Sequence, residues 1–428
     1  MNIDKAMIMR KIIGLLIVFL SVQGATAQDN QYDSVIGKAI SQSDWFETRA
    51  LYESTADSLS DYMRLFSGAL IDHNFNNPAG AVEKIQRMYD EYNAQMGGNV
   101  FSLFWMMSEN LAKLGHYEAA HSICTSLLAQ GREYMDEGTR TAYETNVVLF
   151  DLKSQWPRMS VTNTAVNYEI PFIVESEQIK FSAESGKKRF SAMLDSASQI
   201  TIIDRELAQQ LELNISADSI QFNETRCPLT LLDTLQLGDA KYVNVVCAVL
   251  PLREVGVTDC SMILGNDLLY LFPEIELDYE HQTMYLRSQT ESLPNAPRNL
   301  MLNKVPYIQV QLNGIPATVV WDTGSNKSSV EPHFYNAHRD QLPLKHKHGS
   351  KRGRTATGKT RKLNYAILPQ IELSIGDKTG EMTDVYIIED MPHVELMGVP
   401  FDATLSALPP AEFKRLIINF KEMYFIVK

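Results

Sequence analysis

The chain has 428 residues and a mass of 48.4 kDa, which is too long for one compact core and predicts about two to four domains. Apolar residues make up 45% of the chain and charged residues 21%, so the disordered and fibrous classes are excluded. The 39 Lys and Arg against 52 Asp and Glu produce a net charge of -13, which argues against binding of nucleic acid along the whole surface.

The N-terminal 27 residues have the pattern of a secretory signal peptide. Three basic residues precede the apolar run Ile12–Val22, and the small residues Ala25 and Ala27 indicate cleavage before Gln28. The run is short for a membrane span, and no later stretch reaches the roughly 18 apolar residues that a span needs. We expect an exported protein, periplasmic or secreted, with a signal peptide over 1–27 and no transmembrane span in the mature chain. An uncleaved anchor is the alternative.

Residues 28–155 are predicted to form an all-α domain, because apolar residues recur there at helical spacing and prolines are rare. The segment 111–120 places Gly115, Tyr117 and Ala120 where two helices would cross at a tight turn, and it resembles a tetratricopeptide helical hairpin. A weaker copy around Ala81 lies 39 positions before Ala120, longer than the usual ~34-residue period. Such a domain could bind a protein partner, whereas a plain helical bundle would offer no groove.

After residue 157 the sequence changes to short β-rich runs that contain an internal duplication. A strand over 190–194 leads into Asp195, and a strand over 317–321 leads into Asp322. Each copy later has an apolar strand that ends in glycine, Gly265 being 70 residues after Asp195 and Gly398 being 76 residues after Asp322. Unrelated domains rarely share this order and spacing, so we predict two lobes, over 165–288 and 300–428.

The motifs Asp195-Ser196-Ala197-Ser198 and Asp322-Thr323-Gly324-Ser325, each followed by its apolar strand and glycine, resemble the lobes of a single-chain, retropepsin-like or pepsin-like aspartic protease. The resemblance implies that each lobe is a small, mostly-β, barrel-like domain and that the two aspartates meet across a pseudo-two-fold axis. The expected fold class is therefore multidomain α + β, with an N-terminal all-α helical-hairpin domain followed by two tandem mostly-β aspartic-protease-like lobes.

Asp195 and Asp322 are the predicted catalytic pair of an aspartic-type endopeptidase. Two carboxylates that meet in a partly desolvated cleft cannot both ionise cheaply, so one stays protonated over an acid-to-neutral range. The ionised carboxylate would deprotonate a water and the protonated one would donate to the substrate carbonyl. This chemistry hydrolyses a peptide or protein substrate without a cofactor or a metal. The sequence leaves open which aspartate takes which role.

The resemblance also implies roles for the residues that follow each aspartate. Ser196 and Thr323 would hydrogen-bond across the lobe interface and hold the two loops together. The hydroxyls of Ser198 and Ser325 would donate to the outer oxygen of their own aspartate. Gly324 would let backbone amides approach the carboxylate.

The first copy departs from the family pattern at Ala197, where glycine is usual. If that position requires a positive φ, alanine costs about 1 kcal/mol. Two other hypotheses stay open: a catalytically inactive module that binds extended peptides as an added strand, and a helical-repeat scaffold in which the β lobes are passengers. Two aspartates that merely cap turns are a further alternative.

A protease of this type needs a segment that covers the substrate. The first copy has no glycine between residues 192 and 237, so we expect no mobile hairpin there. The second copy has Gly349, Gly353 and Gly358 in the matching interval, which predicts one flap over about 346–361. An ordinary surface loop is the alternative.

The predicted flap also contains a match to the phosphate-binding pattern G-x-x-x-x-G-K-[ST] over 353–360. That chemistry requires a buried strand before the loop and a helix after it, whereas a basic polar segment and a β-like run flank this one. We therefore expect no nucleotide binding. Between residues 342 and 371 there are eight Lys or Arg and no acidic residue, so the segment is a basic arm of an acidic protein.

Cysteine and histidine usage predicts no metal site. The four cysteines form no CxxC pair and no Cys/His set at ligand spacing. His346 and His348 stand beside lysines that would repel a cation. Cys247 and Cys260 could form a disulfide after export, and buried free thiols are the alternative.

Overall fold

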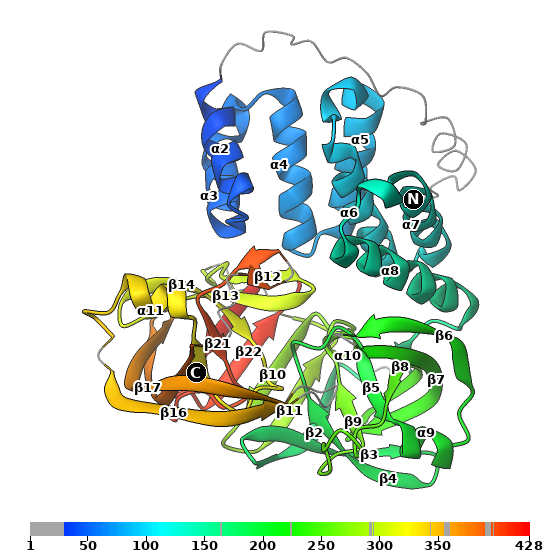
Figure 1. Cartoon of the computed structure of the whole chain (residues 1–428), viewed down its shortest axis with the longest axis vertical. Helices are drawn as coiled ribbons and strands as arrows, with labels where there is room; N and C mark the ends of the chain where they lie inside the picture. The colour runs from blue at the N-terminus through cyan, green and yellow to red at the C-terminus, as the bar shows by residue number, and fades with distance from the viewer. Residues whose placement is uncertain are drawn as a thin grey trace. The chain divides into compact units, whose positions relative to one another are not determined.

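The computed structural model describes residues 30–162, 165–222, 225–290, 293, 295–342, 344–354, 360–389, 395–396 and 398–428. The expected signal peptide over 1–27 and the expected flap residue Gly358 lie outside these ranges. The described residues form two compact units, one helical and one β-rich (Figure 1). Helices in the first part of the chain and strands in the second confirm the predicted fold class.

The helical unit is built from α-helices that cover most of residues 31–155. They are α2 (Gln31–Ser41), α3 (Trp45–Thr55), α4 (Asp61–Asn74), α5 (Pro78–Met96), α6 (Asn99–Lys113), α7 (Tyr117–Gly131) and α8 (Glu137–Gln155). Side-chain caps mark where several helices begin. The side chains of Asn30, Asp44 and Asn77 accept hydrogen bonds from amides in the first turns of α2, α3 and α5. Every helix within the described ranges is too short or too polar to traverse a lipid bilayer.

Helices α6 and α7 form the helical hairpin that was predicted over 111–120. Gly115 has a φ of 79° in the turn, a left-handed conformation that costs glycine little. Leu111 and Ala120 are buried on the facing sides of the two helices, within one apolar cluster that also includes residues of α4, α5 and α8. The tetratricopeptide assignment of this hairpin stays a prediction.

The β-rich unit begins with the strands of the first lobe. They are β1 (Ser160–Val161), β2 (Asn167–Glu175), β3 (Gln178–Ser185), β4 (Lys188–Leu194), β5 (Thr201–Asp204), β6 (Ile215–Phe222), β7 (Thr225–Leu237), β8 (Ala240–Leu250), β9 (Met262–Leu264), β10 (Glu274–Asp278) and β11 (Thr283–Arg287). Two short helices, α9 (Arg205–Gln210) and α10 (Asn266–Leu269), interrupt them.

The second lobe repeats this order. Its strands are β12 (Leu300–Asn303), β13 (Val305–Leu312), β14 (Ile315–Trp321), β15 (Ser329–Val330), β16 (Lys345–Arg354), β17 (Thr360–Ile375), β18 (Lys378–Ile388), β19 (Glu395–Leu396), β20 (Val399–Pro400), β21 (Ala403–Leu405), β22 (Arg415–Asn419) and β23 (Tyr424–Val427), with the helix α11 (Pro332–Ala337) after β15. In each lobe the strand that leads into the aspartate pairs in parallel with a later short strand, β4 with β9 and β14 with β21. The predicted duplication is therefore present in the topology.

The structure corrects the predicted match between Gly265 and Gly398. The strand beside β14 is β21, so the residue equivalent to Gly265 is Ser406. The amide of Gly265 donates to the Thr201 hydroxyl at 3.2 Å, and the amide of Ser406 donates to the Ser328 hydroxyl at 3.1 Å in the same place. The prediction was wrong because a local apolar-apolar-glycine pattern does not reveal which strand pairs in parallel with a distant one.

The structure also corrects the expectation of a single hairpin. The first lobe has one, formed by β6 and β7, in addition to the β16–β17 hairpin over the predicted flap. Phe222 at the end of β6 pairs with Thr225 at the start of β7. The phosphate-loop match lies between β16 and β17, so a strand follows it and not the helix that phosphate binding requires.

A continuous sheet joins the two lobes. Strand β10 of the first lobe pairs antiparallel with β22 of the second, with Glu276 opposite Ile417, while β11 and β23 extend the sheet on either side. Ile275 and Ile418, which face each other in this pairing, are fully buried. Burial of apolar side chains from both lobes in one sheet fixes their relative position.

The cysteines within the described residues are buried and unpaired: Cys124, Cys227, Cys247 and Cys260. Cys247 and Cys260 thus form no disulfide in the structure, which agrees with the alternative of buried thiols. Burial raises the pKa of Cys260 to about 12, so this thiol stays protonated and unreactive.

Candidate active site

The two predicted catalytic aspartates occupy equivalent positions at the ends of buried strands. Asp195 follows β4, and its amide donates to the Leu264 carbonyl at 2.9 Å. Asp322 follows β14, and its amide donates to the Leu405 carbonyl, also at 2.9 Å. The strands β9 and β21 therefore hold the first residue of each loop in the same way.

Backbone amides fix the orientation of each carboxyl group. Oδ1 of Asp195 accepts hydrogen bonds from the amides of Ala197 at 3.0 Å and Ser198 at 3.1 Å. Oδ1 of Asp322 accepts the corresponding bonds from the amides two and three residues later, at the same two distances. The loops thus have matching internal geometry, and one oxygen of each carboxyl group is left for other partners.

The serines three residues after each aspartate act through their backbone and not through their hydroxyls. The Ser198 hydroxyl donates to the carbonyl of Ile200 at 2.8 Å, and the Ser325 hydroxyl donates to the carbonyl of Lys327 at 2.9 Å. A hydroxyl has one hydrogen, so neither can also donate to its aspartate. The expectation that they donate to the outer carboxyl oxygens was wrong, because each hydroxyl instead donates to a backbone carbonyl two residues later in its own turn.

Ser196 and Thr323 link the two loops by reciprocal hydrogen bonds. The Ser196 amide donates to the Thr323 hydroxyl at 2.9 Å, and the Thr323 amide donates to the Ser196 hydroxyl at 3.0 Å. Each hydroxyl then donates onward to the strand of the opposite lobe, Ser196 to the Trp321 carbonyl and Thr323 to the Leu194 carbonyl. Both side chains are fully buried, so water does not compete for these bonds.

The carboxyl groups of Asp195 and Asp322 meet at the junction of the lobes and hydrogen-bond to each other. The carboxyl of Asp195 also lies directly against Gly324, where an added Cβ would come within 2.6 Å of the Asp195 Cγ. Neither Gly324 nor Ala197 has a positive φ, so Ala197 causes no backbone strain. Glycine at 324 leaves room for the opposite aspartate and does not serve an unusual backbone angle.

Burial raises the pKa of both carboxyls, and the other contributions to the pKa differ between them. Burial, followed by the charge of Asp322, raises the pKa of Asp195 to about 7. Burial also raises the pKa of Asp322, but amide hydrogen bonds from Gly324 and Ser325 and a hydrogen bond from Asp195 oppose it. Two such carboxyls in contact titrate as a pair, so one proton is retained by the pair after the other has left.

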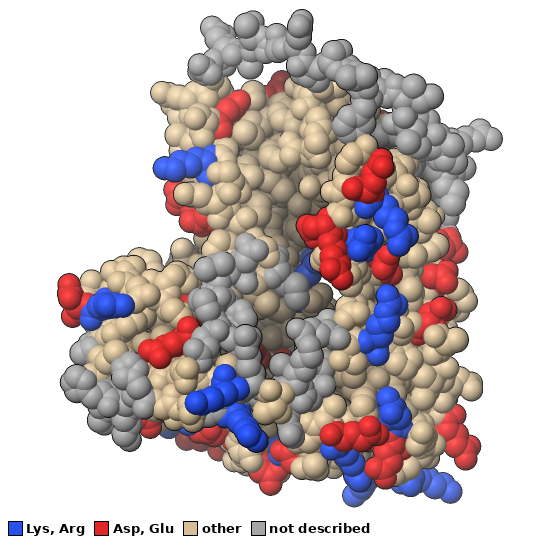
Figure 2. Space-filling view, in the orientation of Figure 1, with Lys and Arg blue, Asp and Glu red and all other residues tan. Residues whose placement is uncertain are grey.

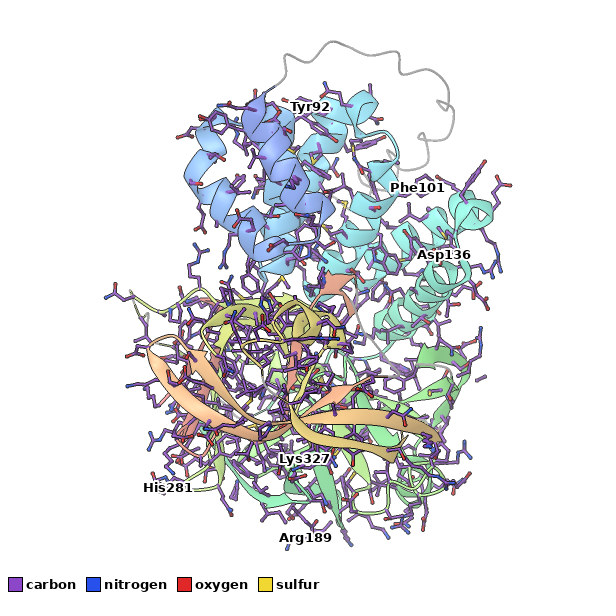
Figure 3. The ribbon with its side chains drawn as sticks, turned by 60° about the vertical axis from the view of Figure 1, so that its left-hand side comes forward. Tyr92, Phe101, Asp136, Arg189, His281 and Lys327 are labelled. Atoms are coloured by element: carbon purple, nitrogen blue, oxygen red, sulfur yellow. The ribbon has the colours of Figure 1, made fainter. Side chains whose placement is uncertain are left out.

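Sequence reasoning missed a contact from the first lobe to the second active loop. The turn between β2 and β3, where Ser176 and Glu177 have φ of 52° and 64°, brings the Gln178 side-chain amide to the Gly324 carbonyl at 3.3 Å. Beside it, Glu177 forms an ion pair with Lys327, which Figure 3 labels within the β-rich unit. No local motif marks these residues, because they approach the loop only when the lobes are joined.

Two of the glycines predicted for the flap, Gly349 and Gly353, lie in strand β16. Gly349 lies in β16 opposite Tyr365, whose ring an added Cβ would meet at 2.6 Å, so ring packing explains this glycine. Gly353 pairs with Arg361 further along the same hairpin. Within the described residues no group of three or more His, Cys, Asp or Glu side chains is arranged to hold a metal ion.

We expect Thr323→Val to destabilise the β-rich unit by about 1–3 kcal/mol, because the buried Ser196 amide loses its acceptor. Denaturant unfolding would measure the change, and hydrogen exchange at 194–199 should rise with it. Thr323→Ser retains the hydroxyl and is the matched control. If the valine variant unfolds like the serine variant, the hydrogen bonds between the loops contribute nothing to stability.

Of the comparisons with known proteins, the match to a family model bears on this site. No curated protein matches the chain. Among solved structures, a retropepsin-like aspartic protease from Rickettsia conorii matches with 17% identity and a TM-score of 0.22, over 30% of this chain and 94% of that one. The family model described as aspartyl protease matches residues 181–268 and 308–401, one segment in each lobe and each with one of the two aspartates. The chain therefore contains an aspartyl protease domain in two segments.

Proposed function

We propose that the chain is an exported aspartic endopeptidase in which Asp195 and Asp322 activate a water molecule. The observation that carries the proposal is the meeting of two buried carboxyls on matching, hydrogen-bonded loops, where the pair can hold one proton and one negative charge. General acid–base hydrolysis needs this combination of states in one place. Export rests on the signal pattern over 1–27.

In the proposed reaction the proton is given to Asp195, whose pKa burial raises to about 7. Ionised Asp322 takes a proton from a water whose oxygen bonds to the peptide carbonyl carbon, while Asp195 gives its proton to the carbonyl oxygen. In the tetrahedral intermediate, Asp322 returns its proton to the amide nitrogen as the carbon–nitrogen bond breaks. Asp195 regains a proton from the hydroxyl that becomes the new carboxyl group. The two aspartates end as they began, and fixed amides on each Oδ1 keep them in position.

A peptide-binding module without turnover is the second candidate, favoured by Ala197 at a position where the family pattern has glycine. Such a module would bind an extended peptide against the exposed edges of the hairpin strands β6 and β16, which end their sheets. The two candidates share the fold. They differ in whether the two aspartates hydrolyse the peptide after it has bound.

We expect Asp195→Asn and Asp322→Asn each to remove peptide cleavage by at least about 1,000-fold, because each change removes an acid or base that nothing else replaces. Cleavage of a fluorogenic peptide library by the full chain would measure this. Asp377→Asn, an exposed change distant in sequence from both loops, is the matched control and should cleave normally. Peptide binding that persists in all variants with no cleavage in any of them would favour the binding module.

The protonation states also predict a bell-shaped dependence of cleavage on pH. Asp195 must be protonated, so kcat/KM should fall as the pH rises through its pKa of about 7. Asp322 must be ionised, so activity should also fall as the pH drops through its pKa. A pH series with one peptide, with and without a chelator, measures both limbs. Full activity at pH 9, or loss of activity in the chelator, would contradict the proposed dyad.

The basic arm predicts a preference among substrates. Arg352 and Lys362 are exposed and lie directly opposite each other in the β16–β17 hairpin, and Figure 2 shows Lys and Arg side chains over these strands. Like charges at paired positions repel, and an acidic peptide would relieve that repulsion. Each exposed pair contributes under about 1 kcal/mol and is weakened by salt.

Replacing Lys351, Arg352 and Arg354 together by Gln should therefore weaken cleavage of acidic peptides more than cleavage of neutral ones, by a few fold at low salt. Steady-state kinetics with two matched peptides at two salt concentrations would measure the difference. An equal effect on both peptides would show that the arm does not select substrates.

A further inference from the structure

In the second active loop, one peptide bond connects the aspartate to a side chain of the first lobe. The Ser325 amide donates to Oδ1 of Asp322 at 3.1 Å. The carbonyl of the same peptide bond, that of Gly324, accepts from the side-chain amide of Gln178 at 3.3 Å. A peptide bond is planar, so a hydrogen bond at its carbonyl also fixes the direction of its N–H. Gln178 therefore acts on the Asp322 carboxyl through a single rigid group.

The first active loop has the same arrangement at a neighbouring peptide bond. The Ala197 amide donates to Oδ1 of Asp195 at 3.0 Å. The carbonyl of that peptide bond, that of Ser196, accepts from the side-chain amide of Asn266 at 3.3 Å. In both loops, a carboxamide side chain thus donates to the carbonyl of a peptide bond whose N–H holds the aspartate.

Asn266 also reaches the second lobe. Its side-chain amide donates to the Lys304 carbonyl, in the turn between β12 and β13, at 2.8 Å. Its backbone amide donates to the Ser198 carbonyl of the first active loop, also at 2.8 Å. A carboxamide has two N–H groups, and here both donate to carbonyls while the residue is only 2% exposed. The orientation of Asn266 is therefore fixed by partners from both lobes.

The second lobe has no carboxamide at the corresponding place. Strand β21 pairs with β14 as β9 pairs with β4, so the residue equivalent to Asn266 is Ala407. An alanine side chain donates no hydrogen bond. The donor for the second loop comes instead from Gln178, at the start of β3 in the first lobe. The same kind of bond therefore reaches the two loops by different routes.

The turn that presents Gln178 is held by ion pairs. Glu175, at the end of β2, pairs with Lys180 at 2.7 Å, and the Lys180 side chain is only 2% exposed. Glu177 pairs with Lys327, just beyond the second active loop. A glutamine on an anchored turn loses less conformational freedom on bonding to the loop than one on a mobile turn would.

We propose that Gln178 and Asn266 are positioning residues that orient the aspartates of the second and the first loop, respectively, through these peptide bonds. The proposal rests on the proposed function and deepens it, because it adds to the dyad the side chains that hold its amide donors. Hydrogen bonds in a chain polarise one another, so each carboxamide also strengthens the N–H bond to its carboxyl. Both donors belong to the first lobe, which therefore helps to orient the carboxyls of both loops.

Gln178→Met in the full chain tests the second loop, because methionine keeps the length of the side chain and lacks the N–H. Nuclear magnetic resonance signals of backbone amide protons report the strength of each hydrogen bond without turnover. We expect the Ser325 amide proton to move upfield and to exchange faster with solvent. The amide of Gly324, which belongs to the preceding peptide bond, and that of Ala197 should stay unchanged. Gln311→Met, at an exposed glutamine of β13, is the matched control and should move none of these signals.

Asn266→Ala tests the first loop by removing its carboxamide, and it keeps the backbone bond to the Ser198 carbonyl. We expect the Ala197 amide signal to move upfield, while the amide signals of Ser198 and Ser325 stay unchanged. If this variant fails to fold by circular dichroism, Gln178→Met alone decides, because that side chain is only partly buried. An amide signal that stays unchanged in its own folded variant, or signals of both loops that move together, would overturn the proposal.

Kinetics separate this proposal from the proposed function. In an active enzyme, each variant should lower kcat by about three- to tenfold with KM nearly unchanged, because a misaligned carboxyl slows the chemical step and not peptide binding. A lower unfolding temperature with an unchanged kcat would show a merely structural role and contradict the proposal. Absence of cleavage by the wild type under all conditions would contradict the proposed function, while the amide signals would still decide the role of the two side chains.

Discussion

The reciprocal hydrogen bonds between Ser196 and Thr323 are the constraint on which the site depends. They are buried, they run in both directions across the lobe junction, and each hydroxyl continues to the strand that leads into the opposite aspartate. Two carboxyls repel when both are charged, so a weaker junction would let the lobes separate until each aspartate was solvated. Burial at this junction raises the pKa of both carboxyls, and the charge of Asp322 raises that of Asp195 further, so the two groups share one proton.

The sheet between the lobes supports that junction from a distance. Its central strands β10 and β22 come one from each lobe, and their inward side chains are fully buried. Moving the lobes apart would therefore expose apolar surface as well as break hydrogen bonds. The buried sheet stabilises the joined arrangement of the lobes, and this stability offsets the repulsion between the two carboxyls.

Carrying both lobes in one chain lets equivalent positions differ. Ala197 matches Gly324, the basic β16–β17 hairpin matches the less charged β6–β7 hairpin, and Lys327 contacts Glu177 with no equivalent ion pair among the described residues of the first active loop. Two identical subunits could not encode such differences, because every residue would appear twice. The common frame gives both carboxyls the same amide hydrogen bonds, and the differences lie in the residues around them.

The sequence alone determined the α-then-β order, the duplicated strand-to-aspartate motif and the equivalent places of Asp195 and Asp322 in it, because each depends on contiguous residues with a regular period or spacing. Only the tertiary structure decided that Ser406 corresponds to Gly265, that the first lobe also has a hairpin, and that Gln178 reaches the second active loop. Parallel pairing and contacts between lobes join residues far apart in the chain, and their partners are selected by the closed fold.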